Sequence, residues 1–257
     1  MSGLPPCVYT LGISEPAFRD DIITVCGDGC RSATQMQCAL RTLAPGQHLF
    51  TDGDKQLYIY NVQAGSLRLY KTLGNGRRQV IGFAFPGDFV GLGMSSEFRF
   101  NAQSIGHGEV RCLPKRAFHA LAREKAGLAF RLYQATSIEL VGAHDLALTV
   151  GQRDAAGALA VFLLWLSQRN EQRGIDPKRI SLPMSRTDIA DYLGLTGETV
   201  SRVFTRLKTQ GLVKVTGRRL VQLTNIPALI ELAEGTAGQT QHKSISPPAP
   251  SLRVLAE

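Results

Sequence analysis

This chain of 257 residues lacks the features of a membrane protein and of a disulfide-rich secreted protein. No apolar run reaches the roughly 18 residues of a membrane span, and the longest, Leu159–Leu166, is typical of a buried helix. The first residues lack the basic and then apolar pattern of a secretory signal. Five cysteines, an odd number, argue against a disulfide framework. We therefore expect a cytoplasmic protein with no membrane partner.

Motifs of the common enzyme classes are missing as well. The sequence contains no Walker loop, no nucleophile elbow and no His-Glu-x-x-His motif. Its histidines do not show the spacing of metal ligands. These absences predict that the protein is not an enzyme.

Two short amphipathic helical patterns meet at a tight glycine turn within Met184–Leu207. Ser185 is a good N-cap for the first helix, and Asp188 stands three residues on, where the acid of a capping box belongs. Gly194 permits the left-handed backbone that ends a helix, and Thr196 can cap a second one. The segment predicts a helix-turn-helix.

The second of these helices has an apolar face and a polar face, as a helix that lies in a DNA groove requires. Arg202 can pair with both acceptors of a guanine, Glu198 can accept from a cytosine amino group, and Ser201 can serve a base or a phosphate. A helical hairpin with a merely solvated face is the alternative. The residues that we expect to contact DNA are Arg186, Thr196, Gly197, Glu198, Thr199, Ser201, Arg202 and Arg218.

Charge and a following hairpin favour DNA over that alternative. The segment 178–219 holds nine Lys/Arg against three Asp/Glu, so +6 of the chain's net charge of +8 lies there. Such an excess suits phosphate neutralisation. Two alternating strands around Thr216-Gly217 predict a wing beside the helices, with Arg218 and Arg219 near its tip.

The region upstream alternates short strands with Gly/Asp turns, which indicates a β-sandwich or barrel. The clearest strands are Leu57–Val62, Ser66–Lys71 and Gln79–Phe85, and the expected helices are Lys115–Arg123, Leu128–Val150 and Ala155–Gln168. We divide the chain into a cysteine-containing leader (1–38), the barrel (39–126), a long helix (127–151), the helix-turn-helix domain (152–235) and a disordered tail (236–257).

The sequence Leu193-Gly194-Leu195-Thr196, followed by Glu198-Thr199-Val200-Ser201-Arg202, resembles the recognition region of the Crp/Fnr transcription regulators. Its Glu-x-x-Ser-Arg spacing is similar to the Fnr/FixK branch, whereas the cyclic-AMP receptor branch has Gly where Ser201 stands. The resemblance implies an α+β fold with a cyclic-nucleotide-binding-like jelly roll, a long dimerisation helix and a C-terminal winged helix-turn-helix. It further implies a homodimer that reads a TTGAT-N4-ATCAA-like palindrome and controls low-oxygen or nitrogen-oxide-linked metabolism.

Two effectors are weighed within this resemblance. Cyclic-AMP receptors bind the nucleotide through a Glu and an Arg, but the comparable stretches here, Phe89–Gly93 and Phe100–Gln103, contain neither residue. Cyclic AMP is therefore not expected, because a buried phosphate without a cation is costly. A 4Fe–4S cluster is the second candidate, with ligands Cys26, Cys30, Cys38 and Cys112. Their spacing departs from the Fnr pattern, and Cys112 is shifted by one residue, which turns a strand side chain to the opposite face. Unligated thiols remain the alternative.

A second function class stays open at this stage. A cupin-like ligand-binding or catalytic barrel with an accessory DNA-binding domain would need His and carboxylate ligands clustered on the barrel strands. The predicted strands carry no such cluster. For a regulator, exposed barrel loops such as Leu73–Arg78 are candidates for contact with RNA polymerase.

Overall fold

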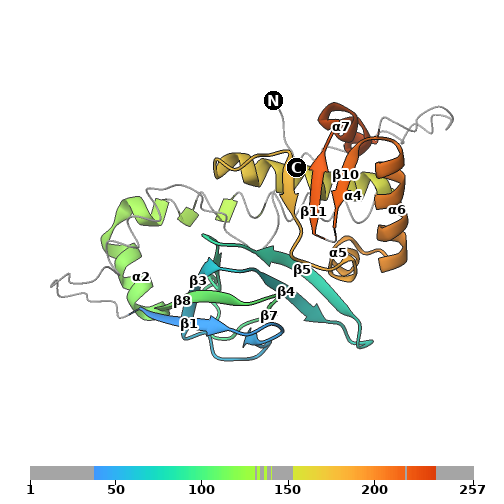
Figure 1. Ribbon diagram of the computed structural model, residues 1–257. Helices are drawn as coiled ribbons and strands as arrows, with labels where there is room; N and C mark the ends of the chain where they lie inside the picture. The colour runs from blue at the N-terminus through green and yellow to red at the C-terminus, as the bar shows by residue number, and fades with distance from the viewer. Residues whose placement is uncertain are drawn as a thin grey trace, which may run out of the picture.

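The computed structural model describes residues 38–130, 132–133, 136–137, 140, 153–217 and 219–235. The N-terminal domain consists of two four-stranded antiparallel sheets, with strand orders β1-β8-β3-β6 and β2-β7-β4-β5 (Figure 1). Such a double sheet is a jelly roll. Its strands are β1 (Ala39–Leu43), β2 (His48–Phe50), β3 (Tyr58–Ala64), β4 (Leu67–Thr72), β5 (Arg78–Ala84), β6 (Phe89–Val90), β7 (Asn101–Ser104) and β8 (Gly108–Pro114).

Turn glycines and aromatic packing shape this jelly roll. Gly65, between β3 and β4, has a φ of 78°, and a Cβ there would lie 2.4 Å from the carbonyl oxygen of His107. Only glycine fits such a close approach. Between the sheets, Phe50 stacks on Phe98, and both rings contact the cluster that includes Tyr60. Aromatic side chains therefore fill the interior of the jelly roll.

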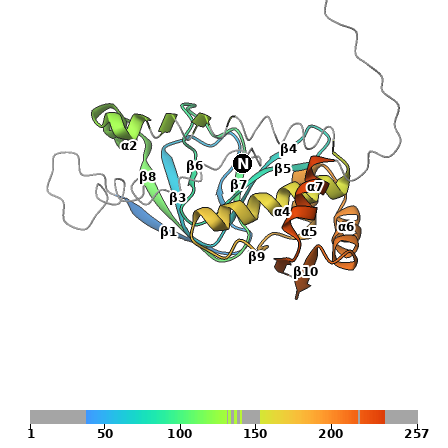
Figure 2. The same cartoon turned by 90° about the horizontal axis from the view of Figure 1, so that it is seen from above.

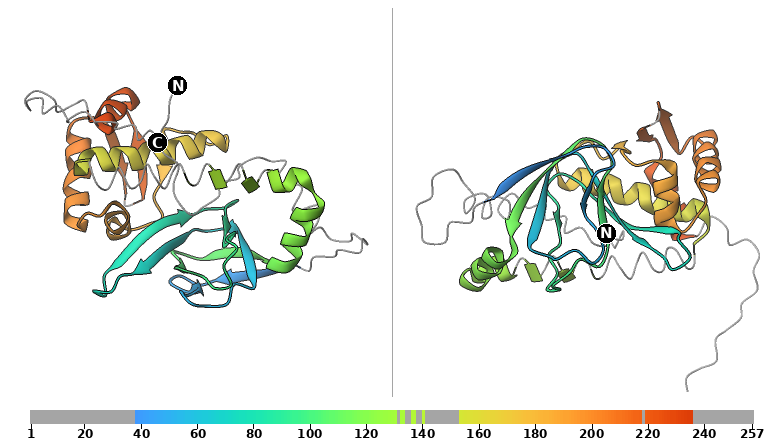
Figure 3. Two further views of the ribbon diagram at one scale, coloured as in Figure 1. Left: turned by 180° about the vertical axis from the view of Figure 1, so that it is seen from behind. Right: turned by 90° about the horizontal axis from the view of Figure 1, so that it is seen from below.

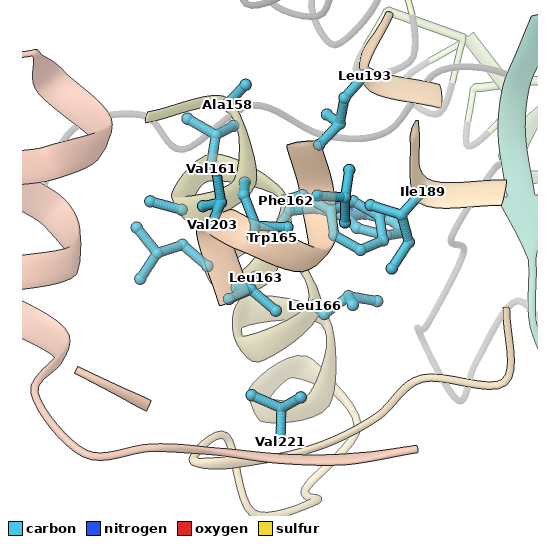
Figure 4. Close-up of a cluster of buried hydrophobic side chains, with 14 of the residues drawn as sticks. Ala158, Val161, Phe162, Leu163, Trp165, Leu166, Ile189, Leu193, Val203 and Val221 are labelled. Atoms are coloured by element: carbon cyan, nitrogen blue, oxygen red, sulfur yellow. The ribbon is translucent and has the colours of Figure 1, made fainter. Parts of the chain in front are cut away.

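The C-terminal domain is a three-stranded sheet with four helices around it. Helix α2 (Lys115–Glu124) directly follows the last strand of the jelly roll, and α4 (Ala155–Gln172) is the first helix of the C-terminal domain. Helix α4 is apolar all round and is buried on almost all sides (Figure 4). The sheet has the order β10-β11-β9. The remaining elements are β9 (Arg179–Ser181), α5 (Arg186–Leu193), α6 (Gly197–Thr209), β10 (Val213–Thr216), β11 (Leu220–Leu223) and α7 (Ile226–Glu234).

The two domains share one hydrophobic core. Phe83 of β5 is fully buried, and its ring lies 6.2 Å from the ring of Phe162 in α4 and 5.6 Å from that of Tyr192 in α5. Val80 of β5 belongs to the same cluster, and Figure 2 shows α4 running along the β4–β5 side of the jelly roll. Strand β5 therefore serves both the jelly roll and the C-terminal domain.

The predicted elements differ from the structure at several points. Helix α4 continues to Gln172 rather than ending at Gln168, and sequence reasoning missed β9 and α7. The predicted long helix is helical at 126–130 and at 132, 133, 136, 137 and 140, while its other positions lie outside the described residues. The leader before Cys38 and the tail after Gly235 also lie outside them. Among the described helices, none is long and apolar enough to cross a membrane.

The shared core predicts a large effect for Phe83→Ala. Loss of the ring should lower the free energy of unfolding by about 3–4 kcal/mol, because it removes buried area and leaves a cavity between the domains. Urea denaturation measures this change. Leu73→Ala, at an exposed hairpin position, is the matched control and should cost about 0.5 kcal/mol or less. A cost below about 1 kcal/mol for Phe83→Ala would show that the domains do not share a core.

Candidate nucleic-acid interface

Helix α5 begins with a complete capping box. The backbone N–H of Asp188 donates to Ser185 Oγ at 3.0 Å, and the N–H of Ser185 donates to Asp188 Oδ2 at 3.0 Å. Gly194, with a φ of 69°, ends the helix in the left-handed conformation. The predicted first helix and both of its ends are confirmed. A helix with both ends fixed supplies a firm base for the helix that follows.

Helix α6 presents the two faces that the sequence predicts. Thr196 caps it by accepting from the N–H of Thr199 at 3.1 Å. Its apolar residues Val200, Val203, Phe204 and Leu207 are buried. On the opposite face the side chains of Glu198 and Arg202 are 72% and 79% exposed, and α6 lies on the outer side of the C-terminal domain, away from the jelly roll (Figure 3). The polar face is therefore accessible to a groove.

The polar side chains of α6 hydrogen-bond within the helix. Arg202 Nη2 donates to Glu198 Oε1 at 2.5 Å, one helical turn away. Ser201 Oγ donates to the carbonyl oxygen of Gly197 at 2.8 Å. An exposed ion pair of this kind is worth only about 0.3–0.5 kcal/mol. Either side chain can therefore exchange this partner for another at little cost.

Arg186 has a different environment from the other predicted contacts. Its guanidinium carbon lies 3.3 Å above the centre of the Phe204 ring, and its buried Nη1 has no hydrogen-bond partner in the described protein. Burial lowers the pKa of Arg186 to about 10, so it still carries its charge at neutral pH. The stack joins α5 to α6, because Phe204 stands on the buried face of α6. Arg186 thus supports α6, and a contact with DNA remains a prediction.

The wing is present as an antiparallel hairpin. Strands β10 and β11 pair from Val213 opposite Leu223 to Thr216 opposite Leu220. Lys214 and Arg219 are exposed on it. Arg218, a predicted DNA contact, lies outside the described residues.

The jelly roll grips α5 through two arginines, which we call the hairpin clamp: Arg68 of β4 and Arg78 of β5, bound to Asp188 and Asp191. Arg68 Nη1 and Arg78 Nη2 donate to the same oxygen, Asp188 Oδ1, at 2.8 and 2.9 Å. Arg78 also donates from Nε and Nη2 to Asp191 Oδ2 at 2.9 and 2.7 Å. Sequence reasoning missed the clamp, since its partners lie 110–120 residues apart in the chain.

Asp188 remains charged although its side chain is only 3% exposed. Burial alone would raise the pKa of Asp188. The hydrogen bonds from Ser185 and the charge of Arg68 outweigh burial and hold this pKa below its ordinary value. One oxygen of the carboxylate caps α5, and the other receives the clamp.

The described cysteines do not fit a common metal cluster. Cys112 is buried in the interior of the jelly roll beside Tyr60, and burial raises the pKa of its thiol. Cys38 packs on the opposite face of that sheet, against the cluster that holds Ile59 and Phe118. Cys26 and Cys30 lie outside the described residues. Within the part of the chain that is described, no group of three His, Cys, Asp or Glu could hold a metal ion.

The stretch comparable to the nucleotide-binding segment of cyclic-AMP receptors packs on other parts of the jelly roll. A Cβ on Gly91 would lie 2.9 Å from the ring of Phe98, so this ring packs directly on the backbone where the comparable stretch of cyclic-AMP receptors binds ligand. Gln56 donates to the carbonyl oxygen of Gly91 and accepts from Lys115 Nζ at 2.9 Å. Phe98 and Gln56 therefore pack against the backbone of the stretch Phe89–Gly93.

Comparisons with known proteins agree with this architecture. Residues 157–232 match the Crp-like helix-turn-helix domain, and residues 40–125 match the cyclic nucleotide-binding domain. A jelly roll joined to a winged helix-turn-helix with an exposed polar helix defines a transcription regulator that binds DNA. The chain belongs to the Crp/Fnr family and is a regulator of its FixK/Fnr type. The cupin-like alternative is not favoured.

Two relatives and one solved structure illustrate the similarity. The chain is 42% identical to the nitrogen fixation regulation protein FixK of Bradyrhizobium diazoefficiens, over 66% of this chain and 72% of that protein. It is 39% identical to the transcriptional activatory protein AadR of Rhodopseudomonas palustris, over 66% and 72%. The structure of FixK2 from Bradyrhizobium japonicum has a TM-score of 0.71 at 34% identity and covers 76% of this chain and 96% of its own.

The clamp predicts how stability depends on pH. Asp188→Asn keeps the shape of the side chain but removes the charge partner of Arg68 and leaves Arg78 with Asp191 alone. It should lower the free energy of unfolding at pH 7 by about 2–3 kcal/mol, less than a fully buried pair would lose, because Arg68 and Arg78 are 20% and 28% exposed. Since the folded pKa of Asp188 is depressed, its stabilisation is fully present above about pH 4 and is lost as the pH falls through the folded pKa.

Urea denaturation from pH 7 down to about pH 3 measures this effect. The gap between wild type and Asp188→Asn should narrow below about pH 4. The exposed Asp52→Asn is the control and should show no gap at any pH. A gap of constant size across the range would contradict the account of Asp188.

Proposed function

We propose that this regulator binds a TTGAT-N4-ATCAA-like palindrome as a homodimer and reads each half-site with Glu198, Ser201 and Arg202. The observation that carries the proposal is the capped helix α6, whose exposed face gathers these three side chains above a buried apolar face. Thr196, Gly197 and Thr199 lie at its first turn, where N–H groups and the helix dipole attract phosphate. Lys214 and Arg219 of the wing add positive charge for the flanking backbone.

An exposed apolar row supports the homodimer. Phe130, Tyr133 and Leu140 are 60%, 70% and 58% exposed, and their spacing of three and seven residues places them on one side of the predicted long helix. Leu128 and Leu132 pack the other side against the jelly roll. A second copy can cover the row, and a two-fold protein then matches a two-fold DNA site.

We propose that the protein activates genes of low-oxygen or nitrogen-oxide-linked metabolism in the cytoplasm and catalyses no reaction. Its similarity to FixK and to the activatory protein AadR supports this physiology. Activation requires contact with RNA polymerase, for which the exposed hairpin tip 73–77 is a candidate. Arg78, the last residue of the predicted contact loop, binds the protein's own α5 instead.

Neither weighed effector is part of the proposal. The lack of a Glu and an Arg in Phe89–Gly93 and Phe100–Gln103 argues against a cyclic nucleotide. The opposite-face placement of Cys38 and Cys112 argues against a cluster held by all four predicted ligands.

Arg202→Ala tests the reading helix. The variant should lose about 1–3 kcal/mol of discrimination for the palindrome, since one bidentate guanine contact disappears, while it keeps weak and salt-sensitive binding to unrelated DNA. Fluorescence anisotropy with specific and scrambled duplexes measures both affinities. Arg206→Ala removes the same charge one turn further along α6 and should weaken both duplexes equally. Wild-type discrimination in Arg202→Ala would refute the assignment.

The cysteine geometry predicts that the purified protein needs no iron to bind the palindrome. Protein prepared without oxygen should lack the visible absorbance of a 4Fe–4S cluster and bind with unchanged affinity after Cys38→Ser. A matched preparation of Cys112→Ser reports on core packing alone, because Cys112 is buried. A brown, iron-containing dimer that loses DNA binding on exposure to air would overturn this part of the proposal.

A further inference from the structure

We propose that the hairpin clamp fixes the distance between the two half-sites that the dimer accepts, so that Arg68 and Arg78 select the spacer length without touching DNA. The inference rests on the proposed reading of a palindrome by a homodimer. It assigns a specificity role to jelly-roll residues that lie outside the recognition helix.

The clamp is anchored firmly on the jelly-roll side. Arg68 donates from Nε and Nη2 to Gln103 Oε1 at 2.9 and 2.7 Å, and Gln103 Nε2 donates to the carbonyl oxygen of Gly46 at 2.6 Å. Gln103 of β7 thus orients the guanidinium of Arg68 so that its Nη1 points to Asp188. Because five donor groups in a fixed plane bind with defined geometry, arginine transmits a position as well as a charge.

On the side of the C-terminal domain, the clamp binds α5, the helix that supports α6. Asp188 caps α5 through Ser185, and α5 carries α6 through the stack of Arg186 on Phe204. A displacement of Asp188 therefore moves α6. Gln79 Nε2 also donates to the carbonyl oxygen of Asp191, which ties β5 to the far end of α5.

A second, separate contact prevents rotation about the clamp. Arg169 of α4 forms a buried ion pair with Asp88, on the loop before β6. Together with the rings of Phe83 and Phe162, this pair and the clamp hold the C-terminal domain at points on different elements. Contacts on both α4 and α5 leave the domain one orientation relative to the jelly roll.

This orientation determines which spacer fits. In a two-fold dimer, the distance between the α6 helices follows from the angle between each jelly roll and its C-terminal domain. One base pair added to the spacer moves a half-site by about 3.4 Å and turns it by about 35° around the duplex. A domain held by all of these contacts cannot follow that movement. Without the clamp, α5 loses its ion pairs and can shift further than α4, which the shared core and Arg169 still hold. The clamp therefore weakens binding to palindromes whose spacer has the wrong length.

The experiment compares spacer selectivity in the full-length protein. Affinities are measured for duplexes with two TTGAT-type half-sites separated by three, four or five base pairs. The wild type should bind one spacer best, and the Arg68→Gln/Arg78→Gln variant should bind the other spacers with a selectivity ratio reduced about tenfold, an ordinary size for coupling between two sites. Arg77→Gln, which removes the adjacent exposed charge, should keep the wild-type ratio.

The ratio of affinities for different spacers distinguishes a positioning role from a loss of stability or of charge. Loss of stability or of charge would change the affinity for every spacer by the same factor. If the double variant does not fold as a dimer, Arg78→Lys decides, since it keeps the charge but loses the paired contact with Asp191, and it should show an intermediate ratio. A wild-type ratio in the folded variant would overturn the inference and leave the proposed function intact. A wild type that binds no palindrome at all would overturn both.

Discussion

The carboxylate of Asp188 accepts hydrogen bonds from two domains at once. One oxygen completes the cap of α5, and the other receives Arg68 and Arg78 from the jelly roll. A buried carboxylate is costly unless its lone pairs are satisfied and its charge is paired, and here both conditions are met only when the domains are in contact. The stability of α5 and the position of α6 therefore both depend on the ion pairs of Asp188 with Arg68 and Arg78.

The shared core extends this link. The side chain of Phe83 in β5 packs against Phe162 of α4 and Tyr192 of α5. Apolar burial and ion pairing therefore stabilise the same interface between the domains. Where most of the free energy of folding comes from buried apolar area, such an interface is expected to behave as part of a core rather than as a contact between independent domains. The jelly roll thus holds α4 and α5, which pack with α6 in the same core.

Much of the reading helix could be predicted because its determinants are local. Caps at Ser185 and Thr196, the turn at Gly194 and the helical spacing of apolar residues lie within one short segment, and the structure confirms each. The clamp could not be predicted, because Arg68 and Arg78 stand in alternating strands where a charged residue ordinarily faces solvent. Only the fold brings them to Asp188. Phe83 was likewise indistinguishable from a residue of the jelly-roll core.

The cysteines show a case in which a small detail of register carried information. The shift of Cys112 by one position led us to expect the opposite strand face, and its side chain lies in the interior of the jelly roll while Cys38 lies outside. Four cysteines in a resembling sequence are therefore not by themselves evidence of one shared cluster site. Residue identity suggested the ligand set, but the alternation of the strand determines which side chains can meet.

The most direct test of the account is a hydroxyl-radical footprint of the full-length protein on a duplex that carries the TTGAT-N4-ATCAA palindrome. Two α6 helices in a symmetric dimer should protect two half-sites, centred about one helical turn apart and arranged symmetrically about the middle of the spacer. Protection of a single half-site, or uniform protection independent of the palindrome, would contradict the claim that this protein reads DNA as a two-fold dimer.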